Sequence, residues 1–135
     1  MVASDRDAID TYRELSRRLA ERSVLSELRS MFSRRYTLSE LLDWMHDRLG
    51  FHKGNIRRHN DPREILAYGK GRCGEFSILF TSLCLAHNYK ARLALDMSDH
   101  VWTEVWDKKS QRWVHIDPTE KKIDDPLMYE RDWKK

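Results

Sequence analysis

The period of the hydrophobic pattern changes once in this chain, close to residue 90, and that change limits the possible folds most strongly. Before it, apolar residues recur three and four positions apart, which is typical of helices packed on one side. After it, apolar and polar residues alternate, which predicts strands with one buried face. Helices followed by strands favour an α+β fold with a small antiparallel sheet over a β-α-β alternation.

Four helices are predicted in the first half of the chain. Two follow from helical spacing alone, and a third begins at Thr37, where Thr37 and Glu40 form a capping box and Gly50 is a natural residue just beyond the end. A short fourth helix begins at Asp61-Pro62, because aspartate caps a helix and proline is favoured in its first turn. The first two helices are defined by Ile9, Tyr12, Leu15 and Leu19, and by Val24, Leu25, Leu28, Met31 and Phe32.

A strongly apolar segment over residues 76–86 follows Gly71 and is long enough to be a buried helix, which His87 and Asn88 are expected to end. Three strands are then predicted, over residues 91–95, 100–106 and 113–117. The last two are expected to form a hairpin with its polar side chains on one face and its apolar side chains against the core. Its predicted cross-strand pairs are His100 with Asp117, Trp102 with His115, and Glu104 with Trp113.

At 135 residues the chain is long enough for one domain with a buried core, and we expect a single domain over residues 1–135. Within it, residues 1–59 form a helical N-terminal part, and residues 60–135 form the core that carries the chemistry. Asp125 and Pro126 predict one last short helix near the C-terminus.

The composition argues against several classes of function. No apolar run reaches the roughly 18 residues that a membrane span needs, so no membrane partner is predicted. No apolar segment follows the charged N-terminus, so we predict a cytoplasmic location. The net charge is only +3, and nucleic acid is not an expected partner, because the basic clusters lack aromatic platforms. These clusters, predicted to be solvated, are Arg34-Arg35, Arg57-Arg58-His59 and Lys134-Lys135.

A cysteine, a histidine and an aspartate occur in the order that a thiol nucleophile would need. Cys73 lies at the expected start of the buried helix, where the helix dipole favours a thiolate by roughly 0.3–1 kcal/mol. His100 could take the thiol proton, and Asp117 could fix the tautomer of the imidazole. Gly71 and Gly74 are predicted to leave room for a substrate to approach the sulfur. The same three residues could also be an ordinary buried cysteine, a sheet histidine and a turn aspartate.

The other thiol and most other imidazoles are not assigned to this site. Cys84 lies among leucines and is predicted to belong to the core. No CxxC or HxxxH spacing is present, so neither a metal nor another cofactor is predicted. The five tryptophans suit either packing or stacking on a flat ligand such as a sugar. His46, His52, His59 and His87 are expected at the surface or at helix caps, and His115 lies on the polar face without an assigned role.

Three ordered motifs resemble the transglutaminase-like core of the cytoplasmic peptide:N-glycanase family. They are Gly71-Arg72-Cys73-Gly74-Glu75, Asp99-His100-Val101-Trp102-Thr103-Glu104 and His115-Ile116-Asp117-Pro118 with Glu120. The resemblance implies a papain-like fold, with the nucleophile Cys73 on a helix and His100 and Asp117 on adjoining strands. It also implies hydrolysis of the amide between an N-glycan and asparagine, through a thioester acyl-enzyme. Trp102, Glu120 and Trp133 match the residues that contact the sugar in the family.

The chain departs from the family pattern upstream of Cys73. The eukaryotic members carry two CxxC pairs that bind structural zinc, whereas this chain has a short basic loop over residues 51–59. Two alternatives to a glycanase follow from the same residues. One is a cysteine peptidase or transglutaminase that acts on peptide or glutamine amides, and the other is a non-catalytic module that binds sugar or peptide.

Overall fold

The computed structural model describes residues 5–96 and 100–123. The predicted helix at Asp125-Pro126 and the predicted sugar contact Trp133 therefore lie outside the described residues. Within them the helices are α1 (Asp5–Leu19), α2 (Arg22–Ser30), α3 (Leu38–Arg48), α4 (Pro62–Tyr68) and α5 (Cys73–Ala86). The strands are β1 (Gly50–Phe51), β2 (Lys70–Gly71), β3 (Ala91–Leu95), β4 (Val101–Asp107), β5 (Arg112–Asp117) and β6 (Lys122–Ile123).

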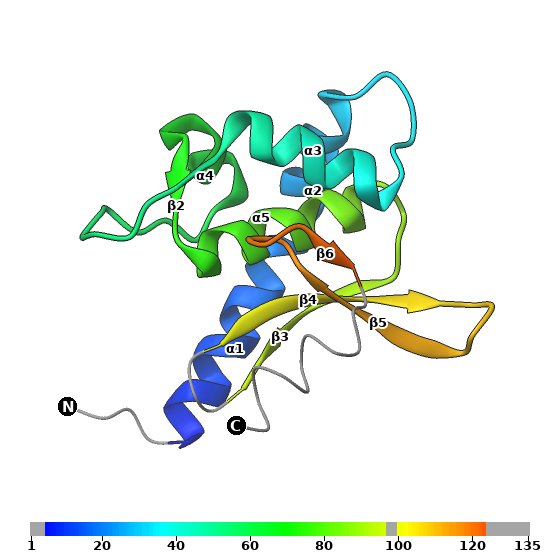
Figure 1. Ribbon diagram of the computed structural model, residues 1–135. Coiled ribbons are helices and arrows are strands. Elements are labelled where there is room, and N and C mark those ends of the chain that lie inside the picture. Colours follow the sequence, from blue (N-terminus) through cyan, green and yellow to red (C-terminus); the bar gives the residue numbers. More distant parts are fainter. Residues whose placement is uncertain (1–4, 97–99, 124–135) are drawn as a thin grey trace.

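Helix α5 is the centre of the fold (Figure 1). It packs against β3 and β4 on one side, while α1, α2, α3 and α4 contact it elsewhere. Neighbouring elements cover the helix on all sides, which its sequence permits because apolar residues occur on every face. The prediction of a buried helix is confirmed, and His87 is its C-cap. The two glycine-rich strands β1 and β2 form a separate parallel pair just before α5.

The larger sheet is antiparallel, with the order β3-β4-β5-β6, so the predicted α+β architecture is confirmed. Its inner face carries Thr103, Val105 and Ile116, which are all buried, and Val105 and Ile116 belong to the same hydrophobic core as α5. Its other face carries Trp102 and Glu104. The predicted assignment of residues to the two faces of the hairpin is therefore correct.

The predicted register of the β4–β5 hairpin is wrong by two residues. Glu104 pairs with His115 rather than with Trp113, and Thr103 pairs with Ile116. The shift arises at the loop, which has four residues between the paired Asp107 and Arg112. The Asp107 carboxylate accepts hydrogen bonds from the N–H of Lys109 and the hydroxyl of Ser110. The predicted register would need a two-residue Lys-Lys loop, which lacks the residues that such tight turns favour.

The N-terminal capping signals in the helical half are confirmed, whereas Gly50, predicted just beyond the third helix, begins β1 and has no positive φ. Thr37 and Glu40 form the predicted capping box at the start of α3. The carboxylate of Asp61 accepts the N–H of Arg63 at the start of α4, and Gly69 ends that helix with φ of 77°. Local chemistry thus sets where α4 stops, and four residues after Gly69 the chain enters α5 at Cys73.

Candidate functional site

Cys73 is the first residue of α5 and is partly exposed, and its thiol is free. Arg72 occupies the N-cap in an extended conformation. An arginine side chain has only donors, so it cannot accept hydrogen bonds from the first N–H groups of the helix. Those groups and the helix dipole therefore favour negative charge at the position of the sulfur.

Two hydrogen bonds align α5 with β4 and set which residues lie side by side. Ser77 Oγ donates to the carbonyl oxygen of Val101 at 3.1 Å. One turn further along, the hydroxyls of Thr81 and Thr103 are 2.9 Å apart. Four helical residues rise roughly 6 Å and two strand residues roughly 6.6 Å, so the two elements stay in step. These two bonds place the N-terminal half of α5, which begins at Cys73, beside the start of β4, which begins one residue after His100.

His100 is held in place just before β4. Its backbone N–H donates to Oδ1 of Asp96 at 3.1 Å, and its carbonyl oxygen accepts the N–H of Asp96 at 3.0 Å. Its ring stacks on the indole of Trp102, with centroids 5.4 Å apart and planes inclined by 26°. The imidazole is therefore oriented by a buried tryptophan and by the backbone bonds between His100 and Asp96.

Asp117 ends β5 and is buried, with 9% of its surface exposed. Its Oδ1 accepts the backbone N–H groups of Thr119 and Glu120, at 3.1 and 3.2 Å. Continued one residue beyond the pair of Thr103 and Ile116, the register of the hairpin puts Asp117 opposite Trp102. Asp117 was predicted to lie opposite His100, which is two residues earlier and therefore diagonal to it. Of the predicted sugar contacts, Trp102 is buried and Glu120 is exposed.

Helix α3 holds the turn that follows Asp117. His46 Nε2 donates to the carbonyl oxygen of Pro118 at 2.6 Å, and Asp43 forms an ion pair with Lys121 at 2.7 Å. Asp43 and His46 lie three residues apart, on one side of α3. His46 was expected to be a surface or capping residue, and nothing local in the sequence indicates a partner 72 residues away.

An ion pair between Arg58 and Glu75 covers the first turn of α5. The guanidinium Nε and Nη2 meet the two carboxylate oxygens at 2.5 and 2.8 Å, and Glu75 is only 2% exposed. The hydrogen bond to Glu75 raises the pKa of Arg58, and the charge of Cys73 adds a smaller contribution. Arg58 is exposed, as predicted for the cluster at residues 57–59, but it also pairs with the buried Glu75, which the sequence did not indicate.

The glycines on either side of Cys73 make room for this ion pair. A Cβ added to Gly71 would lie 2.7 Å from Cβ of Glu75, and one added to Gly74 would lie 3.2 Å from Nη2 of Arg58. We predicted that both glycines leave space for a substrate. The structure gives Gly71 a different role, because the atoms next to it belong to Glu75, whereas Gly74 has both Arg58 and a cavity beside it.

A polar network lies on the outer face of the sheet, beside His100. Glu104 is 6% exposed and accepts a hydrogen bond from Arg92 Nε at 2.7 Å. Its other oxygen lies 2.8 Å from His115 Nδ1. Trp102 Nε1 points to the same pair, 3.1 Å from His115 Nδ1 and 3.4 Å from the carboxylate. Glu104 thereby fixes the indole on which His100 stacks.

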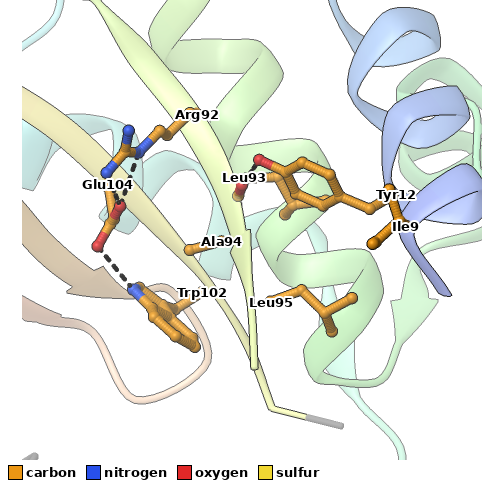
Figure 2. A pocket seen from close by; sticks show the side chains of 8 residues that line it. All are labelled: Ile9, Tyr12, Arg92, Leu93, Ala94, Leu95, Trp102 and Glu104. Atoms are coloured by element: carbon orange, nitrogen blue, oxygen red, sulfur yellow. Dashed lines mark hydrogen bonds and ion pairs between the residues drawn. The ribbon is translucent and has the colours of Figure 1, made fainter. Parts of the chain in front are cut away.

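A cavity of about 400 Å³ lies at the outer edge of β3, next to this network (Figure 2). Figure 2 shows Trp102 and Glu104 on one side of β3, and Tyr12 and Ile9 of α1 on the other. Within residues 5–96 and 100–123, no group of three His, Cys, Asp or Glu side chains could hold a metal ion. No helix in the same part of the chain is long and apolar enough to span a membrane.

Comparison with known families gives one match that covers most of the chain. The model described as the transglutaminase-like superfamily matches residues 22–118. Among curated proteins, the peptide-N(4)-(N-acetyl-beta-glucosaminyl)asparagine amidases of Drosophila melanogaster and Oryza sativa subsp. japonica are each 50% identical over 78 residues. That segment is 58% of this chain but only 12% and 17% of those two proteins, so the chain spans a small part of the relatives it matches.

Solved structures show the same fold at low sequence identity. Rad4-Rad23 bound to a 6-4 photoproduct UV lesion has a TM-score of 0.65 and 13% identity, over 87% of this chain and 38% of that one. A putative cysteine protease from Cytophaga hutchinsonii has a TM-score of 0.58 and 16% identity, over 82% of this chain and 43% of that one. At such identities the likeness extends to the fold alone.

Proposed function

Because the chain belongs to the transglutaminase-like superfamily, we propose that it is a cysteine amidohydrolase of the peptide:N-glycanase type. It would hydrolyse the amide between an N-glycan and asparagine. The similarity to proteins named as that amidase supports this substrate, over the 58% of the chain that they match. The observation that carries the proposal is the alignment of α5 with β4, which supports a position of Cys73 near His100.

In the proposed reaction, Cys73 attacks the side-chain carbonyl carbon of the glycosylated asparagine after giving its proton to His100. The tetrahedral intermediate then expels the glycosylamine, whose nitrogen takes that proton from His100, and a thioester to Cys73 remains. His100 next takes a proton from water, which attacks the thioester. The products are an aspartate side chain and the free thiol, whose sulfur regains the proton.

Three features of the site support these roles. The first N–H groups of α5 could donate to the oxyanion as well as favour the thiolate. Asp117 would orient His100, and the bonds from Thr119, Glu120 and α3 hold the aspartate and its turn. Arg58 adds positive charge near the sulfur.

The sugar would lie on the outer face of the sheet, with Trp102, Glu120 and Trp133 as its proposed contacts. Trp102 is buried and bonded into the Glu104 network, so it would serve mainly as a rigid wall for His100 and the sugar. We also propose a single catalytic domain and a cytoplasmic location, which suits an enzyme that needs a reduced thiol. Its partner would be a glycopeptide, with no metal, nucleic acid or membrane required.

Release of N-glycan from a denatured glycopeptide tests the proposal, and Cys73→Ala should abolish it. Cys84→Ala is the matched control, since that thiol lies on the same helix but is fully buried. Glycan release by Cys73→Ala would contradict the proposed nucleophile. Exchange of a glutamine amide with an added amine, without any glycan release, would instead identify a transglutaminase.

A further inference from the structure

A second cavity, of about 210 Å³, lies between α1 and the N-terminal end of α5. Gly74 and Val101 both line it, and they directly follow Cys73 and His100 in the sequence. The cavity therefore begins between the immediate neighbours of the two residues that we propose for the chemistry. It differs from the edge cavity in Figure 2, although Tyr12, Leu93 and Leu95 line both.

The chemistry of the walls favours an apolar occupant. Leu15, Ile78, Leu93 and Val101 form much of the surface, and their side chains carry no hydrogen-bonding group. The hydroxyl of Tyr12 already donates to the carbonyl oxygen of Leu93 at 2.6 Å. A sugar ring buried here would leave several hydroxyls without partners, which is costly. An apolar side chain would instead gain from leaving water.

The polar groups that line the cavity belong to the loop before α4 and to the first turn of α5. Nε and Nη2 of Arg58 are engaged by Glu75. Asn60 is exposed and also lines the cavity, as does Thr11 on the exposed side of α1. An apolar interior with a few polar groups around it is typical of specific binding pockets. The volume is below the roughly 300–1,000 Å³ of cavities that hold drug-sized ligands, so a single side chain suits it better than a whole ligand.

We propose that this cavity binds one large apolar side chain of the polypeptide that carries the attacked amide. The inference rests on the proposed function and adds a side-chain specificity to it: polypeptides with leucine, isoleucine, methionine or phenylalanine close to the asparagine. The sugar and the polypeptide would then occupy different sides of β3. Helix α1, which supplies one wall, lies before the residues that the family model matches, so this specificity belongs to the chain's own N-terminal helix.

Binding of unglycosylated peptides to the Cys73→Ala chain tests the cavity without requiring turnover. Each peptide carries asparagine in a glycine and serine background, with one leucine placed in turn at each flanking position. Fluorescence anisotropy measures the affinity against the all-serine peptide. We expect one position at which leucine raises affinity about tenfold or more, since burial of a leucine side chain contributes that much.

Thr11→Trp would fill the mouth of the cavity from an exposed helical position and should remove the preference for leucine. Asp10→Trp is the matched control, because Asp10 is exposed on the same helix and lines none of the cavities described. Equal affinity for all peptides, no binding of any of them, or a preference that survives Thr11→Trp would each overturn the proposal. A leucine preference without release of glycan by the native chain, from a glycosylated form of the same peptide, would instead overturn the proposed glycanase function and leave the cavity assignment intact.

Discussion

The two ends of α5 each carry a free cysteine, and the two thiols have opposite surroundings. At the N-terminal end, Cys73 is partly exposed beside Arg58 and the start of β4. At the C-terminal end, Cys84 and His87 are both fully buried. Burial raises the pKa of the Cys84 thiol far above its ordinary value and lowers that of the His87 imidazole, so both groups stay neutral.

This difference separates reactivity from stability along one helix. The first turn has charged neighbours and free N–H groups, which favour an ionised sulfur. The last turns have aromatic and aliphatic neighbours, which favour neutral groups and tight packing. We therefore expect substitutions near Cys84 to reduce stability, and substitutions near Cys73 to change reactivity more than stability.

The largest loss of stability is expected from Phe80→Ala. Phe80 is fully buried in the middle of α5, and truncation of a buried phenylalanine typically costs about 3–5 kcal/mol. Cys73→Ala should cost much less, since that residue is partly exposed at the helix end. Urea unfolding of both variants gives the comparison, and a larger loss for Cys73→Ala would break it.

A smaller loss, with an effect on the thiol, is expected from Arg58→Met. The substitution leaves the carboxylate of Glu75 buried without its partner, which should cost about 2 kcal/mol after allowance for the half-exposed guanidinium. The unpaired negative charge should also slow alkylation of Cys73. The double variant Arg58→Met with Glu75→Gln should recover both properties in large part. Unchanged alkylation in Arg58→Met would show that the ion pair does not act on the sulfur.

The smallest effect is expected from the pH dependence of His87. Its Nδ1 donates to the carbonyl oxygen of Leu83 at 2.8 Å, and Nε2 has no partner among the described residues. Burial, with smaller contributions from Arg29 and Arg35, lowers its pKa from 6.5 in the folded state. As the pH falls, His87 therefore takes up a proton in the unfolded chain before it does so in the folded chain. Its contribution to the free energy of unfolding is complete above about pH 6.5 and declines below that pH.

The free energy of unfolding between pH 7 and pH 5 measures this effect, which amounts to about 1.4 kcal/mol for each unit by which the pKa is lowered. His87→Gln should flatten the profile over that range, whereas His52→Gln, at a partly exposed position in the loop after β1, should leave it unchanged. A slope that survives His87→Gln would assign the effect to another group.

Features set by neighbouring residues could be predicted from the sequence, and features set by distant contacts could not. The capping residues Thr37 and Asp61 are confirmed because each acts on its own helix. The faces of the hairpin were correct but its register was not, since a slip of two residues leaves an alternating pattern unchanged. Only the loop at Asp107 distinguishes the two registers.

The candidate site shows the same division. The motifs around Cys73, His100 and Asp117 indicate the proposed chemistry, and a bond from Ser77 to Val101 aligns α5, which begins at Cys73, with the start of β4. The roles of Arg58 and His46 were missed because each depends on a partner 17 or 72 residues away. The ion pair also explains Gly71 and Gly74, which could not be assigned without knowing which side chains pack against them.

The central claim is that Cys73 is a nucleophile activated by His100, and the rate of its alkylation as a function of pH tests that claim most directly. The measurement uses the chain with Cys84→Ala, with and without His100→Ala. We predict rapid alkylation at pH 6, where an ordinary thiol is almost fully protonated, and loss of that rate in His100→Ala. A slow reaction at pH 6 that rises only in the alkaline range, and that His100→Ala leaves unchanged, would contradict the account.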